Sequence, residues 1–130
     1  MIGIDTSALI DFFKGNKSLK NLIDELDGIL VLNQISYLEL VFGLDFNKPN
    51  DKKEEKFYDD LYNSLLNFEL DILASKKAAQ INNNLIKVGK IIEPFDCAIA
   101  GIYLANGVDK IITKNTKHFD KIKGLKVLSY

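Results

Sequence analysis

Short apolar runs alternate with longer segments of helical spacing along the 130 residues of the chain. The apolar runs predict strands over residues 1–4, 29–33, 67–72, 110–113 and 125–129. Helical spacing predicts helices over residues 7–14, 18–26, 75–90 and 94–105, one that begins at residue 36, and one that carries apolar residues 57, 61, 65 and 66. This alternation is typical of a parallel sheet flanked by helices. We therefore expect a single α/β domain over residues 1–130, with about five parallel strands.

Two polar segments separate these elements. Residues 45–53 are rich in Asn, Asp, Lys and Pro, which predicts an exposed bend between two antiparallel helices. Residues 114–120 follow the fourth predicted strand, and we expect them to form a loop.

The first strand ends at a carboxylate. Asp5 follows the apolar residues 2–4, and the hydroxyls of Thr6 and Ser7 come directly after it. In an open α/β sheet, ligands bind at the carboxyl ends of the strands. Asp5 is therefore the first candidate for a functional site, although a carboxylate there can also cap the helix that follows. Asp11 lies further along, on what we expect to be the polar side of that helix.

Three more polar residues, Glu39, Asp96 and Asn115, fall at predicted strand ends or helix starts, where they can face the same crevice as Asp5. Mg²⁺ prefers oxygen ligands and is held by one or two carboxylates together with water and phosphate oxygens. A metal ion in such a site activates water and neutralises charge on a phosphodiester. Three converging carboxylates would therefore support hydrolysis without a protein nucleophile.

Each of these residues also has a purely structural interpretation. Ser36 and Glu39 fit the capping-box pattern, in which the glutamate folds back onto the start of its own helix. Asp96 could only complement a helix dipole, and Asn115 could be a turn or cap residue. His118, the only histidine, could cap, pack or touch a phosphate, and a transition-metal site is not indicated around it.

Composition narrows the class of protein. The formal net charge is −1, the chain is 47% hydrophobic, and none of its basic residues is arginine. Phosphate contacts must then come from lysines, backbone amides or His118. The last fifth is locally basic, which suggests either a solvated face or an anion-binding surface. The single Cys97 excludes an internal disulfide, and no apolar run is long enough to span a membrane, so we expect a cytoplasmic protein.

Taken together, four motifs resemble those of the PIN-domain ribonucleases, and specifically of the VapC-type toxins of toxin–antitoxin pairs. Residues 4–10 resemble the opening motif with Asp5, residues 36–40 the second with Glu39, and residues 96–101 the third with Asp96. Residues 112–119 resemble the closing motif, in which a Thr and an Asn or Asp support the metal or the substrate. The resemblance extends over the whole chain.

This resemblance implies an endoribonuclease that depends on Mg²⁺ or Mn²⁺, forms a homodimer, and is inhibited by an antitoxin that enters the active-site groove. It implies that Asp5, Glu39 and Asp96 bind the metal and that Asn115 completes the catalytic set. Substrate contacts are expected from the following residues: Thr6, Ser7, Thr113 and Lys117. Many members carry a fourth acidic residue in the closing motif, whereas this chain has Asn115 and Thr116, so three carboxylates form the expected metal set.

Two other classes of protein remain open on the residues alone. The missing fourth carboxylate is compatible with a PIN-fold module that binds RNA or protein without cutting. A phosphoacceptor receiver domain would also carry an aspartate at a strand end. Such a domain has an acidic pair after its first strand, however, whereas Asp5 is followed by Thr6.

Overall fold

The computed structural model describes all 130 residues and contains five strands and seven helices. In chain order the elements are β1 (Ile2–Ile4), α1 (Thr6–Phe13), α2 (Lys17–Glu25), β2 (Leu30–Asn33), α3 (Gln34–Phe42), α4 (Pro49–Ser64), β3 (Asn67–Phe68), α5 (Ile72–Lys87), α6 (Pro94–Ala105), β4 (Lys110–Ile112), α7 (Thr116–Phe119) and β5 (Lys126–Leu128). None of the helices is long and apolar enough to cross a membrane.

The strands form one parallel sheet with the order β3-β2-β1-β4-β5, which confirms the predicted α/β class. β1 lies at the centre, so Asp5 leaves the sheet between β2 and β4. Receiver domains have the flavodoxin-like strand order 2-1-3-4-5. The order found here excludes the receiver interpretation.

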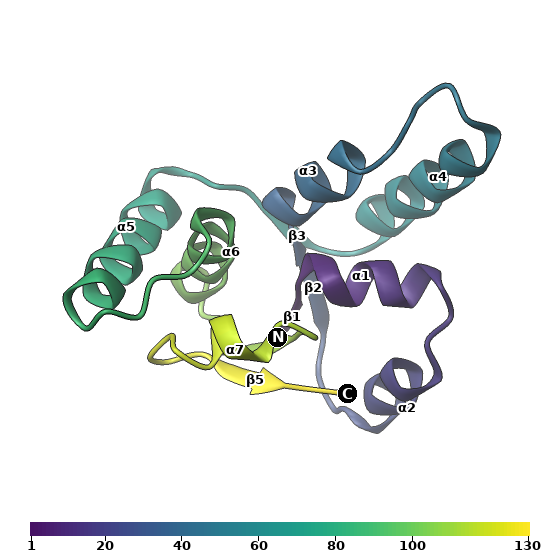
Figure 1. Ribbon diagram of the computed structural model, residues 1–130. Coiled ribbons are helices and arrows are strands. Elements are labelled where there is room, and N and C mark those ends of the chain that lie inside the picture. Colours follow the sequence, from purple (N-terminus) through teal and green to yellow (C-terminus); the bar gives the residue numbers. More distant parts are fainter.

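Helices cover both faces of the sheet (Figure 1), and a separate hydrophobic core lies on each face. Side chains alternate along each strand, so Val31 and Ile111 face α5, α6 and α7, whereas Leu32 and Ile112 face α1, α2, α3 and α4. Because helices cover both faces, the strands are apolar on both sides, as is usual for a parallel sheet.

Gly3 in β1 allows α6 to approach the central strand closely. A Cβ at this position would lie 2.6 Å from the ring of Tyr103. The Tyr103 hydroxyl donates to the Ile4 carbonyl at 2.6 Å and accepts from the Ile4 amide at 3.0 Å and from Asn33 Nδ2 at 2.9 Å. These contacts fix α6, and with it Asp96, against the end of β1.

Several predicted boundaries were wrong. The helix predicted from residue 36 begins at Gln34, the helix predicted to carry residues 65 and 66 ends at Ser64, and the helix predicted to end at residue 90 ends at Lys87. The strand predicted over residues 67–72 is only Asn67–Phe68, and the helix predicted from residue 75 begins at Ile72, because Asp71 caps it by accepting from the Ala74 amide at 2.8 Å. Part of the predicted bend at 45–53 is helical, since Pro49 occupies the first turn of α4. The predicted loop at 114–120 contains the single-turn helix α7.

Candidate active site

Asp5 lies almost fully buried at the carboxyl end of β1, with 3% of its surface exposed. Its Oδ1 accepts from the Ala8 amide at 3.1 Å and from the Ser7 hydroxyl at 2.8 Å, and its Oδ2 accepts from the Thr113 hydroxyl at 2.8 Å. Asp5 is therefore the N-cap of α1 and is also held toward β4. The capping interpretation is confirmed, and a role of the same side chain in an active site stays a prediction.

Glu39 does not cap its own helix. α3 begins at Gln34, and its N-cap is Asn33, whose Oδ1 accepts from the Ser36 amide at 2.8 Å. Glu39 instead accepts a 2.6 Å hydrogen bond at Oε1 from the hydroxyl of Thr6, which belongs to α1. The capping-box alternative was wrong because Asn33 already satisfies the helix start, so the glutamate is left to face α1.

Asp96 lies in the first turn of α6 and is 8% exposed. Its Oδ2 is 2.6 Å from His118 Nδ1 and 3.2 Å from Asn115 Nδ2, which donates to it. Asn115 occupies the N-cap position of α7, yet its side chain makes no capping bond. Its amide is directed at Asp96 instead, while its backbone N–H donates to Thr113 Oγ1 at 2.8 Å.

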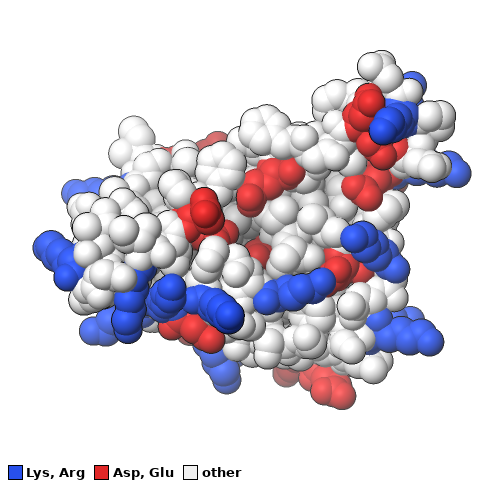
Figure 2. Space-filling model, viewed as in Figure 1, with Lys and Arg blue, Asp and Glu red and all other residues white.

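The charge of Asp96 acts on the other two carboxylates. Burial raises the pKa of Asp5 to about 6, against a usual value of 3.8, and the charge of Asp96 adds to this effect. Burial also raises the pKa of Glu39, again with a contribution from Asp96. No lysine forms an ion pair with Asp5 or Glu39. Figure 2 shows carboxylates around a hollow near the centre of one face, with lysines along its lower border.

These carboxylates do not form a tight cage. No group of three or more His, Cys, Asp or Glu side chains is close enough together to hold a metal ion by itself. The donor set nevertheless suits Mg²⁺, which keeps several waters and needs only one or two protein carboxylates. A divalent cation would also neutralise Asp5, which is buried, and Glu39, which is half-buried, since neither pairs with a lysine. The residues present therefore fit a hydrated hard cation.

The structure places the other predicted site residues in two groups. Thr6, Ser7 and Thr113 use their hydroxyls on the carboxylates of Glu39 and Asp5, as described above, and Lys117 is exposed on α7. Their predicted contacts with substrate stay predictions.

Two participants were missed by the sequence analysis. His118 was considered only as a cap, a packing residue or a phosphate contact, yet it touches Asp96. Its i, i+3 spacing from Asn115 was the available signal, because such residues share one face of a helical turn.

Asp11 is not on a polar surface. It is 6% exposed, lies 2.6 Å from Lys114 Nζ, and accepts from the Tyr130 hydroxyl at 2.7 Å. The backbone N–H of Lys114 also donates to Ser7 Oγ at 3.0 Å. The loop that carries Asn115 is thus tied to α1 at two points. No sequence signal linked residues so far apart in the chain.

Comparison with known proteins identifies the family to which the chain belongs. The family model described as "PIN domain" matches residues 2–125, and the chain belongs to this family. One curated relative is the "tRNA(fMet)-specific endonuclease VapC" of Shigella flexneri, 23% identical over 124 residues, which are 95% of this chain and 92% of that protein.

Solved structures share the fold over the whole chain. VapBC-1 from nontypeable Haemophilus influenzae superimposes with a TM-score of 0.82 and 25% identity, covering 99% of this chain and 98% of the other. VapBC2 from Rickettsia felis, bound to a DNA fragment from its promoter, has a TM-score of 0.81 and 22% identity, covering 100% of this chain and 99% of the other.

Proposed function

We propose that this chain is a metal-dependent endoribonuclease and the toxin of a VapBC-type toxin–antitoxin pair. The observation that carries the proposal is that Glu39 bonds to Thr6, the neighbour of Asp5, and that the charge of Asp96 acts on both carboxylates, with no lysine paired to Asp5 or Glu39. The family membership and the endonuclease name of the Shigella relative support the reaction class.

Asp5, Glu39 and Asp96 are the residues that would hold Mg²⁺ or Mn²⁺. When bound, the cation supplies a Lewis acid that polarises the phosphodiester and makes water a better nucleophile. The carboxylates make the hollow negatively charged, and this charge repels an RNA phosphate until a cation neutralises it. Metal binding and substrate binding are therefore coupled.

The chain's other residues keep these ligands in position. The hydroxyls of Ser7 and Thr113 hold the two oxygens of Asp5, and Thr6 holds one oxygen of Glu39. Catalysis by positioning depends on such support, since small displacements of reacting groups reduce rates strongly. Asn115 and His118 give the same support to Asp96.

We also propose a cognate antitoxin and a homodimer. The solved relatives are described as VapBC complexes, that is, a VapC-type protein with its VapB partner. Light scattering of the purified chain, alone and with the product of an adjacent reading frame, measures both associations.

The experiment that tests the reaction is cleavage of a mixed RNA pool, tRNA included, with Mg²⁺ or with EDTA. We expect cleavage by the parent with Mg²⁺ only, and a loss of at least about 100-fold in Asp5→Asn. The matched control is Asp24→Asn, an exposed aspartate on α2, which should cleave like the parent. Cleavage that is unaffected by EDTA or by Asp5→Asn contradicts the proposal. RNA binding without any cleavage by the parent favours the alternative of a PIN-fold binding module.

A further inference from the structure

A second hollow lies outside the carboxylate site, between α5 and the segment that follows α7. It has a volume of about 920 Å³. Its floor is apolar and includes Ile81, Leu85 and Ile122, which belong to the core on that side of the sheet. Three amide side chains line its walls, and so do four lysines: Lys77, Lys87, Lys121 and Lys123. We call this feature the basic groove.

The charge of the basic groove differs from that of the whole chain. The formal net charge of the protein is −1, yet none of the residues that line the groove is Asp or Glu. Figure 2 shows a row of lysines that runs from the left side of the molecule toward the lower border of the carboxylate hollow. Four cationic groups without nearby acidic partners in the lining attract an anion.

One lysine of the groove lies close in the chain to a residue that contacts Asp96. The Lys121 backbone N–H donates to the His118 carbonyl at 3.3 Å, and the His118 ring contacts Asp96. Lys121 of the groove therefore lies about one turn beyond His118, the residue that contacts Asp96. A polyanion that has one phosphate at the carboxylates can extend along α7 to this surface.

We propose that the basic groove binds the sugar-phosphate backbone of a single-stranded RNA segment adjacent to the one being cut. This inference rests on the proposed ribonuclease function. Lysines act on phosphates as point charges, and the amide groups and apolar floor suit ribose and base surfaces. No aromatic residue lines the groove. Without a ring on which bases can stack, the groove contacts the RNA backbone, so its contacts carry no sequence preference. The closeness of Lys121 to the histidine that contacts Asp96 favours the RNA being cut over an acidic protein as the ligand.

Binding of a fluorescent 20-nucleotide single-stranded RNA, measured by anisotropy in EDTA between 50 and 200 mM salt, tests the inference without any cleavage. The groove variant combines Lys87→Gln, Lys121→Gln and Lys123→Gln. Each phosphate contact in a single strand contributes about 0.7 to the slope of log K against log salt. Loss of three contacts therefore lowers the slope by about 2 and weakens binding by about 10- to 100-fold near 0.1 M salt.

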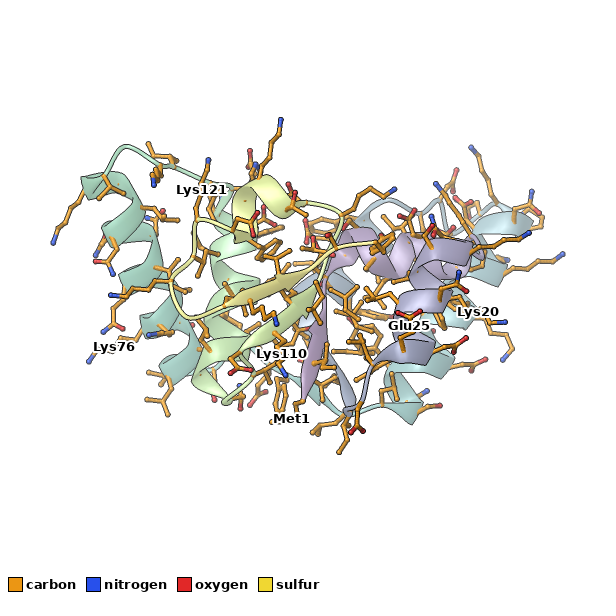
Figure 3. All side chains as sticks on the ribbon, turned by 90° about the horizontal axis from the view of Figure 1, so that it is seen from below. Met1, Lys20, Glu25, Lys76, Lys110 and Lys121 are labelled. Atoms are coloured by element: carbon orange, nitrogen blue, oxygen red, sulfur yellow. The ribbon has the colours of Figure 1, made fainter.

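The control variant removes the same charge from the opposite side of the molecule by combining Lys17→Gln, Lys20→Gln and Lys52→Gln. All three lysines are exposed on α2 or α4. Figure 3 labels Lys20 on the side of the molecule opposite Lys121. Since substitutions of exposed residues usually change stability by no more than about 0.5 kcal/mol, both variants should fold, and their urea midpoints check this.

Weaker binding and a smaller slope in the groove variant alone support the inference. Equal effects in both variants, or none in either, overturn it, because RNA would then respond only to net charge. Retained RNA affinity with lost binding of a poly-glutamate peptide also overturns it in favour of an acidic protein ligand. Cleavage by the parent is measured separately, so a groove that binds RNA in a protein without nuclease activity would contradict the proposed function and leave the groove assignment standing.

Discussion

Replacing Asp5 with asparagine is expected to stabilise the metal-free protein at neutral pH. Asp5 is 3% exposed, and burial raises its pKa to about 6 from the usual 3.8. Each whole step in pKa corresponds to about 1.36 kcal/mol, so the ionised Asp5 destabilises the fold by about 3 kcal/mol. Asparagine removes this charge. It can still accept from the Ala8 amide, and its NH₂ can donate to the Thr113 hydroxyl.

The sign of the pH dependence follows from the direction of the change in pKa. A carboxyl group whose pKa is raised by folding favours the folded state below pH 3.8, and this contribution is lost as the pH rises through 6. The advantage of Asp5→Asn should therefore increase with pH, from about 1.6 kcal/mol at pH 5 to about 3 kcal/mol at pH 8.

Urea denaturation of both proteins in EDTA at pH 5 and pH 8 measures this difference. With saturating Mn²⁺ the order should reverse, because a ligand that binds only the folded parent stabilises it. Asp24→Asn serves as the control and should track the parent under all conditions. An Asp5→Asn protein that is less stable than the parent at pH 8 in EDTA would refute the reasoning, since the buried carboxylate would then not destabilise the fold.

Three further substitutions test how the site is supported. Gly101→Ala places a Cβ 2.7 Å from the backbone of α5, and we expect a loss of about 1–3 kcal/mol in the free energy of unfolding by urea. Tyr103→Phe removes the hydroxyl that bonds the end of β1 and should cost about 1–3 kcal/mol in the same assay; an unchanged midpoint would contradict that role. Lys114→Gln breaks the ion pair with buried Asp11 and frees the loop of Asn115, so kcat for RNA should fall more than KM rises.

The fold could be predicted because its signals are local. Each strand except the third is a short apolar run, and the helix over 94–105 has Pro94 at its start and Gly107 after its end. The third strand was predicted to be too long because residues 69–72 are partly apolar. Asp71 is in fact the N-cap of a helix that begins at Ile72. Apolar character alone did not distinguish the end of a strand from the start of a helix.

The candidate site could be predicted only in part. Residues at strand ends, such as Asp5, share one edge of a parallel sheet whatever the side-chain details. Whether Glu39 caps its own helix or faces the crevice depended on Asn33, which caps that helix and lies outside the Ser36–Glu39 pattern. Contacts between distant segments, such as that of Asp11 with Lys114, are set by tertiary packing, and no local sequence pattern predicts them.

Isothermal titration of the purified protein with Mn²⁺ tests the central claim most directly, namely that Asp5, Glu39 and Asp96 form one metal site. We predict saturable binding of Mn²⁺ by the parent and by the Asp24→Asn control, and no measurable binding by Asp5→Asn or Asp96→Asn at the same concentrations. Binding by Asp5→Asn that equals that of the parent, or a parent that binds no Mn²⁺, would contradict the account.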